Sequence, residues 1–186
     1  MTKKEQILHD IAELFYVNGY EKTSIRDISK SLNISKPGLY YYFTNKQEML
    51  FDMIYEFMDE TNLYLFNELS KLKTPEEKLL CIIQTHIGFF IKYPARMRVL
   101  IYEAHSLEDE YYQKFKHKQL EYKVVIKEIL QEMLKKSGSG RNINVVTFML
   151  LGMLNWIIQW YEPKGIVAPD KLAGEMYSFF IAGLKG

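Results

Sequence analysis

The chain has 186 residues, of which 48% are hydrophobic and 25% are charged, and its formal net charge is +1. This composition fits one globular unit, or two small units that share a core, and it excludes disordered and fibrous chains. The near-zero charge excludes a broadly basic nucleic-acid-binding coat but is compatible with a local cationic patch. The single cysteine, Cys81, excludes an intrachain disulfide and a cysteine-rich zinc site.

The first helix is predicted over residues 3–17, where apolar side chains recur at helical spacing and Asn18-Gly19 comes next as a stop signal. A short second helix is predicted in "TSIRDISKSLNI". Ser24 lies three residues before Asp27 there, which is typical of a capping box. Asn33 stands where the chain must turn sharply, a position that suits a residue tolerating positive φ.

The third helix is predicted in "ISKPGLYYYF", with Ser35 as its cap and Pro37 in its first turn. At ~100° per residue, Leu39 and Phe43 share the side that faces the core. Pro37, Gly38 and Tyr41 then point the opposite way, and Tyr40 and Tyr42 flank them. At least one tyrosine ring should therefore meet solvent or a partner.

Long helices make up the rest of the chain, and no segment is predicted to be a strand. The fourth helix begins after "TNKQE", capped by Thr44 with Gln47 or by Asn45 with Glu48, and runs to about residue 69. Helix-breaking prolines and glycines, and the segment "SGSG", divide the C-terminal part of the chain. The helices are predicted at about residues 75–93, 94–103, 107–136, 142–161 and 169–185. The expected fold class is all-α with about nine helices.

The second and third helices fit a helix-turn-helix, in which the second helix of the pair enters the DNA major groove. A face of proline, glycine and tyrosine lets the backbone approach DNA closely, while phenolic groups bond phosphates and rings pack on thymine methyls. Cations stand at three predicted helix starts, Arg26, Lys36 and Lys46, where helix dipoles also favour phosphate. Hydroxyls lie nearby at Thr23, Ser24 and Ser35. The alternative is that these residues are ordinary caps and surface charges.

The segment "GYEKTSIRDISKSLNISKPGLYYYFTNKQEML" closely resembles the N-terminal signature of TetR-type transcriptional regulators, with its Thr-Ser pair, its "LYYYF" and its Asn-Lys before a leucine. The resemblance covers about residues 7–50 and implies an all-α homodimer. It departs from the family at Asn33, usually glycine, and at Ser29, usually alanine. It implies that one set of residues contacts backbone phosphates: Thr23, Ser24, Tyr40, Tyr42 and Lys46. A second set is implied for base recognition: Arg26, Lys36, Pro37, Gly38 and Tyr41.

We therefore expect a DNA-binding domain over residues 1–46 and an effector-binding and dimerisation domain over residues 47–186. The helix at 142–161 has two apolar sides. One fills its own core, and the other can join the last helix in a two-fold four-helix interface between two copies. The alternative is an internal helix of a monomer. An effector cavity is expected among apolar side chains with a few polar groups: His86, Phe89, Phe90, Met97, Tyr102, Asn155 and Trp156. Taken singly, each of these is also an ordinary core residue.

The final segment, "LNWIIQWYEPKGIVAPDKLAGEMYSFFIAGL", is similar to the end of a TetR subgroup that regulates fatty-acid degradation and responds to acyl-CoA thioesters. The expected function is a repressor released from a palindromic, double-stranded DNA operator by a small hydrophobic effector, with acyl-CoA as one candidate. A helical protein-binding adaptor is the alternative. An enzyme is not expected, because no nucleophile-base set, phosphate loop or paired carboxylate motif is found.

Neither a metal nor another cofactor is expected, since His9, His86, His105 and His117 show no metal-ligand pairing. Membrane insertion is not expected either, because polar residues at 155, 159 and 162 interrupt the most apolar segment. The N-terminal segment carries acidic residues within its apolar stretch and no small-residue cleavage signal. We therefore expect no secretion peptide and a cytoplasmic protein.

Overall fold

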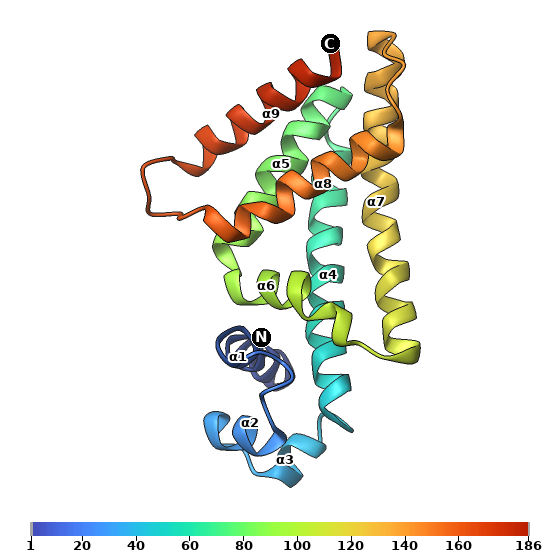
Figure 1. Cartoon of the computed structure of the whole chain (residues 1–186). Coiled ribbons are helices and arrows are strands. Elements are labelled where there is room, and N and C mark those ends of the chain that lie inside the picture. The colour runs from blue at the N-terminus through green and yellow to red at the C-terminus, as the bar shows by residue number, and fades with distance from the viewer. Residues whose placement is uncertain (1, 186) are drawn as a thin grey trace. The chain divides into compact units, whose positions relative to one another are not determined.

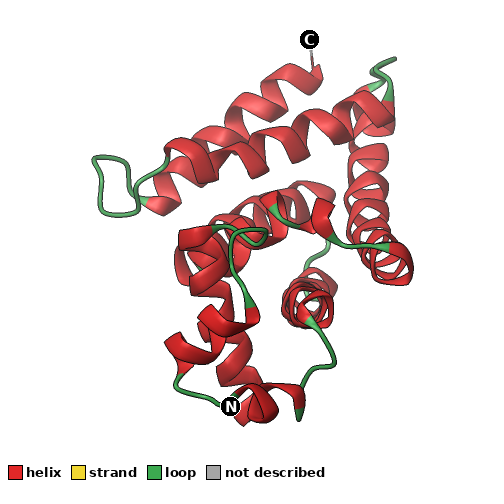
Figure 2. Cartoon of the chain, turned by 60° about the horizontal axis from the view of Figure 1, so that its bottom comes forward, coloured by secondary structure: helices red, strands yellow, loops and turns green. Residues whose placement is uncertain are grey.

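The computed structural model describes residues 2–185, and every regular element in that range is a helix (Figures 1 and 2). The all-α prediction is confirmed. The helices are α1 (Lys3–Asn18), α2 (Ile25–Leu32), α3 (Lys36–Tyr40), α4 (Lys46–Ser70), α5 (Pro75–Lys92), α6 (Pro94–Tyr102), the 3₁₀ helix η1 (Ala104–Ser106), α7 (Asp109–Ser137), α8 (Ile143–Trp160) and α9 (Pro169–Lys185).

Local capping chemistry explains where these helices begin. The Thr2 and Glu5 side chains form a capping box at α1, and Thr74 with Glu77 makes the same reciprocal bonds before α5. The Asn142 side chain accepts from two backbone N–H groups at the start of α8. Prolines occupy the first position of α5, α6 and α9, where a missing N–H costs nothing.

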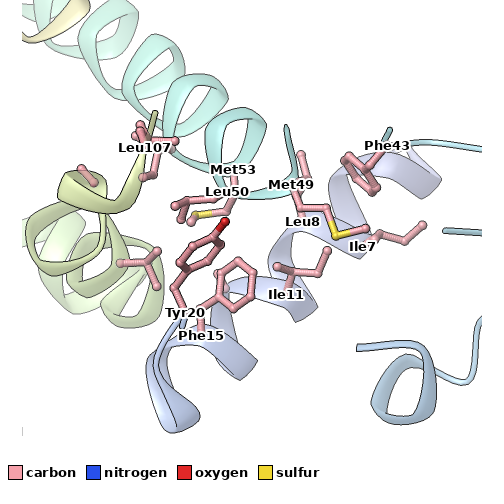
Figure 3. Packing of buried hydrophobic residues seen from close by; sticks show 14 of the residues in the cluster. Ile7, Leu8, Ile11, Phe15, Tyr20, Phe43, Met49, Leu50, Met53 and Leu107 are labelled. Atoms are coloured by element: carbon pink, nitrogen blue, oxygen red, sulfur yellow. The ribbon is translucent and has the colours of Figure 1, made fainter. Parts of the chain in front are cut away.

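The described residues form two compact units. The first consists of Tyr93–Lys118 and the described residues up to Glu60, and its core joins α1 to the start of α4 (Figure 3). Figure 3 shows Ile11 and Phe15 of α1 near Met49, Leu50 and Met53 of α4. Each fully buried side chain of this size contributes roughly 1.5–3 kcal/mol. The predicted domain boundary after residue 46 therefore falls inside the first unit, because α4 supplies part of its core.

The second unit consists of Thr61–Lys92 and the described residues from Gln119 on, and in it α5 packs against α9 and α8. One side of α8 is buried there, through Val146, Leu150, Leu154 and Ile157. By length and composition α8 is also the one helix among residues 2–185 that could cross a membrane, although core helices of globular proteins meet the same criteria. Only 33% of it is buried, so its other side needs a separate explanation.

Candidate nucleic-acid interface

The start of α2 is fixed by the predicted capping box. The Ser24 backbone N–H donates to the Asp27 carboxylate at 2.9 Å, the Ser24 hydroxyl donates to the same oxygen at 2.5 Å, and the Asp27 N–H donates back to Ser24 Oγ at 3.2 Å. These bonds lower the pKa of Asp27, with the Ser24 hydroxyl as the largest cause. Arg26, the next residue after the first of α2, is exposed.

The turn between α2 and α3 has the expected conformation. Asn33 is left-handed, with φ 52° and ψ 40°, and its N–H bonds back to the last turn of α2. The Ser29 hydroxyl donates to the Ile34 carbonyl at 2.7 Å, which ties α2 to the chain entering α3. Sequence reasoning treated Ser29 as a small substitute for alanine and missed this bond, because its partner is five residues away across a turn.

The third helix places its side chains as predicted, although it is shorter. It ends at Tyr40, and backbone bonds from Tyr42 and Phe43 to the Leu39 carbonyl continue the turn beyond it. Leu39 and Phe43 are buried, whereas 82% of Tyr41 is exposed. Lys36, Pro37 and Tyr40 are exposed as well. We call Lys36, Pro37, Tyr40 and Tyr41 the recognition surface.

Two neighbours support this surface. The Tyr42 ring is half-buried and meets the Tyr41 ring edge-on, with centroids 5.0 Å apart. The Ser35 hydroxyl accepts from the Gly38 N–H at 3.1 Å and caps α3. A Cβ at Gly38 would lie 3.0 Å from the Ile34 side chain and 3.2 Å from Ser35 Oγ. Gly38 is therefore needed for local packing, in addition to any close approach to DNA.

Thr23 and Lys46 differ from what the resemblance implies. Only 1% of Thr23 is exposed, and its hydroxyl donates to the Gly19 carbonyl at 2.8 Å. This hydroxyl is therefore not presented to a phosphate. The Lys46 ammonium donates to the carbonyls of Tyr20 and Thr23 at 3.0 and 3.2 Å. Both side chains support the turn before α2.

An open cleft of about 620 Å³ lies beside α2 and adds cations that sequence reasoning did not single out. Lys22 from the turn and Lys30 from α2 both line it, together with Leu14 and Asn18 of α1. Both lysines are exposed. The two lysines line the same cleft because the turn folds back beside α2. They are eight residues apart in the sequence, which gave no indication that they would share a cleft. With Arg26 and Lys36 they place four exposed cations around α2 and α3, partly offset by Asp27, which also lines the cleft.

The predicted effector residues do not gather into one site within either unit. Met97, which is buried, and the exposed Tyr102 belong to the first unit, and the other five residues belong to the second. Asn155 and Trp156 lie on the exposed side of α8, so the expectation that they line an interior cavity differs from the structure. The helical period places Trp156 on one of the two apolar sides of this helix but could not tell whether that side is covered.

The remaining effector candidates lie on α5. Phe90 is buried, and the Phe89 ring lies edge-on to Tyr64 with centroids 5.5 Å apart. Burial lowers the pKa of His86 to about 4, while a hydrogen bond with the Leu154 backbone acts in the opposite direction. A neutral imidazole thus faces α8. Within residues 2–185, no three His, Cys, Asp or Glu side chains come together to hold a metal ion.

The second apolar side of α8 is exposed, and α9 exposes a large apolar side chain as well. The exposed side of α8 carries Val145, Phe148, Met149 and Trp156, and Phe179 on α9 is 77% exposed. The two apolar sides predicted for this helix are therefore present, one buried and one exposed. Contiguous exposed apolar patches are where interaction sites are commonly found.

Known proteins with this architecture match over nearly the whole chain. The family model for bacterial regulatory proteins of the tetR family matches residues 7–53, and the model for the tetracyclin repressor-like C-terminal domain matches residues 72–184. The transcriptional regulator QacR of Staphylococcus aureus is 25% identical over 191 residues, with 100% of both chains covered.

Two solved structures have the same fold. A TetR-family transcriptional regulator from Bordetella parapertussis is 27% identical with a TM-score of 0.88, covering 95% of this chain and 93% of that one. AibR in complex with isovaleryl coenzyme A and operator DNA is 24% identical with a TM-score of 0.87, covering 96% and 97%. At that identity the likeness to AibR establishes the fold alone.

Proposed function

Since the chain belongs to the TetR family of bacterial transcriptional regulators, we propose that it is a ligand-responsive repressor that binds operator DNA through α2 and α3. One observation carries the proposal: Leu39 and Phe43 anchor α3 in the core while 82% of Tyr41 is exposed on the opposite side. A helix buried on one side and bare on the other, at the second position of a helix-turn-helix, can enter a major groove.

Each part of the recognition surface, and each of its neighbours Arg26, Gly38 and Tyr42, has a role in this proposal. Pro37 and Gly38 bring the backbone close to the bases, and the Tyr41 ring packs on thymine methyls. Lys36 and Arg26 reach base edges or nearby phosphates, and the hydroxyls of Tyr40 and Tyr42 bond phosphate oxygens. Ser35 adds an exposed hydroxyl that can donate at the start of α3, whereas the exposed Ser24 hydroxyl already donates to Asp27 and caps α2. The protein would act in the cytoplasm, where operator DNA lies.

A second copy of the chain is the proposed partner for the exposed side of α8 and α9. Two helices from each copy would form a four-helix interface, and the large aromatic residues there fit the composition of interface cores. Two-fold symmetry would present two recognition surfaces to one duplex. Half-sites about one turn apart, ~34 Å, then predict a palindromic operator.

The proposed effector is a small hydrophobic molecule, with an acyl-CoA as the leading class. The complex of AibR with isovaleryl coenzyme A and operator DNA supports this class, and so does the similarity of the final two helices to the acyl-CoA-responsive subgroup. The helix α4 has residues in both compact units. An effector that prefers one orientation of α4 by ~2–3 kcal/mol would change operator affinity roughly 30- to 150-fold.

Selection of duplexes from a randomised pool tests the function. The purified protein should enrich a palindrome and bind it at least ~1000-fold more tightly than a random duplex, with steep salt dependence. Tyr41→Ala should reduce this preference. Tyr16→Ala, which removes an exposed tyrosine from α1, is the matched control and should leave it unchanged. A protein that binds no duplex in preference to another, yet captures a defined protein, would support the adaptor alternative instead.

A further inference from the structure

Two polar side chains are buried in the described part of the second unit, and they differ in whether they have a partner. The Thr147 hydroxyl donates to the Ile143 carbonyl at 2.7 Å, one turn back on α8. Asn62 on α4 is 7% exposed, and its Nδ2 is fully buried without a hydrogen-bond acceptor among residues 2–185. A buried donor without an acceptor destabilises the folded chain. Its retention in a packed interior is a sign that something else supplies the acceptor.

The hydroxyl of Tyr122, on α7, is a second unpartnered polar group in the same unit. The residue is half-buried, and burial raises the pKa of its hydroxyl above the usual value. No hydrogen bond joins this hydroxyl to another residue in the described range. A tyrosine hydroxyl can donate one hydrogen bond, so Tyr122 offers a second donor beside the amide of Asn62.

Two contacts in the first unit show that α4 and α7 run parallel and show which of their sides face each other. The Phe51 ring of α4 stacks on the Tyr111 ring of α7, with centroids 4.8 Å apart. Further along both helices, the Lys118 ammonium of α7 lies 2.5 Å from the Asp59 carboxylate of α4. The contacts advance in the same direction on both helices, and each helix continues without interruption into the second unit.

The next positions of these two rows are Asn62 and Tyr122. Side chains three or four residues apart share one face of a helix. Asn62 comes three residues after Asp59, and Tyr122 comes four residues after Lys118. Each therefore lies on the side of its helix that faces the other helix, at the same level in the second unit. The two unpartnered donors come together there, and neither can satisfy the other by donating to it.

Beyond this polar pair the same two rows become entirely apolar. Leu65 and Leu69 continue the row on α4, and Ile126 and Ile129 continue it on α7. All four side chains are buried. A polar pair at one end of an apolar stretch matches a molecule that carries a hydrogen-bond acceptor at the end of a hydrocarbon chain.

The surroundings of the polar pair are uncharged. None of the buried side chains in the described part of the second unit is a lysine or an arginine. The ammonium of Lys123, the residue after Tyr122, lies 4.3 Å from the centroid of the exposed Phe148 ring. Burial keeps the His86 imidazole neutral, with a pKa of about 4. An ionised group buried here would lose its hydration without gaining a counter-ion, which is strongly unfavourable.

We propose that Asn62 and Tyr122 bind the carbonyl oxygen of the effector, and that this carbonyl belongs to a neutral group such as an acyl thioester and not to an ionised carboxylate. A carbonyl oxygen has two lone pairs and can accept from both donors. The inference rests on the proposed function, and within it distinguishes an acyl-CoA from the free fatty acid. Because Asn62 lies on α4, an effector bound there acts on the helix whose orientation is proposed to control operator affinity.

Isothermal titration calorimetry tests the proposal with three thioesters: isovaleryl-, decanoyl- and palmitoyl-CoA. Each is compared with its thioether analogue, in which a CH₂ group replaces the carbonyl, and with its free acid. At least one thioester should bind the wild type about tenfold or more tightly than its thioether and its acid. Asn62→Leu and Tyr122→Phe should each reduce the preference over the thioether about threefold or more, and the double variant should abolish it. Asn67→Leu, an exposed position on the same helix, is the matched control and should keep it.

Thermal unfolding without any ligand gives an independent readout. Asn62→Leu should raise Tm by about 2–4 °C, because it removes an unpartnered polar group from the interior. A lower Tm would show that the amide has a structural partner such as a buried water, and would overturn the proposal. Tyr122→Phe removes a single oxygen atom, so it carries the binding test even if Asn62→Leu does not fold.

Three binding results would also overturn the proposal: no thioester binds the wild type, thioester and thioether bind equally, or a free acid binds as tightly as its thioester. These failures are distinct from a failure of the proposed function. If the wild type selected no duplex from a randomised pool, DNA-binding repression would be refuted, yet the calorimetry would still decide whether Asn62 and Tyr122 bind a neutral carbonyl.

Discussion

The substitution Phe148→Asp tests whether the exposed side of α8 is an interface between two copies. Phe148 is 57% exposed. For a phenylalanine that can bury about 200 Å², this leaves about 110 Å² to cover in each copy. At about 25 cal/mol per Å² the covered area contributes about 3 kcal/mol per copy, or about 6 kcal/mol for the symmetric pair. Each 1.4 kcal/mol is tenfold, so the dimer should weaken by about four orders of magnitude.

Sedimentation equilibrium over nanomolar to micromolar protein measures this change directly. The wild type should remain dimeric and Phe148→Asp should be monomeric, with affinity for a palindromic duplex lost in parallel. Val17→Asp is the matched control, because Val17 is 73% exposed on α1 in the other unit, and it should stay dimeric. A Phe148→Asp variant that dimerises as tightly as the wild type would show that this side of α8 is covered by something else, or by nothing.

Three further predictions concern stability and pH. Leu39→Ala should lower the free energy of unfolding by about 2–5 kcal/mol, because Leu39 is fully buried and its removal leaves a cavity; a loss below about 1 kcal/mol in urea denaturation would contradict the assigned anchoring role. Ser35→Ala should cost about 1 kcal/mol by removing the cap of α3 and should also weaken DNA binding, whereas Ser35→Asn should restore both. The lowered pKa of His86, about 4, means that the unfolded state binds more protons between pH 6.5 and 4. Stability should therefore fall as the pH is lowered across that window, by about 3 kcal/mol, and this fall should be absent from His86→Asn.

Much of the DNA-binding half could be predicted from sequence because its signals are local. The capping pair Ser24 and Asp27, and the left-handed Asn33, each lie within a few residues of what they fix. The opposition of Leu39 and Tyr41 can be derived from helical period, and burial confirms it.

Contacts between distant segments could not be predicted in the same way. Lys46 and Tyr20 are 26 residues apart, and nothing in either segment indicates their bond. The burial of the Thr23 hydroxyl also depends on how the turn closes. On α8 the period gave two apolar faces, but only packing decides that Leu154 is buried and Trp156 is open.

Cross-linking tests the central claim most directly. Placing 5-iodouracil at each thymine of the selected duplex puts a photoreactive atom where the thymine methyl would lie in the major groove. The account predicts cross-links to Tyr40 or Tyr41 at two positions related by the operator's two-fold axis and about 10 base pairs apart. Cross-links that map only to other helices, or to one position per duplex, would contradict it.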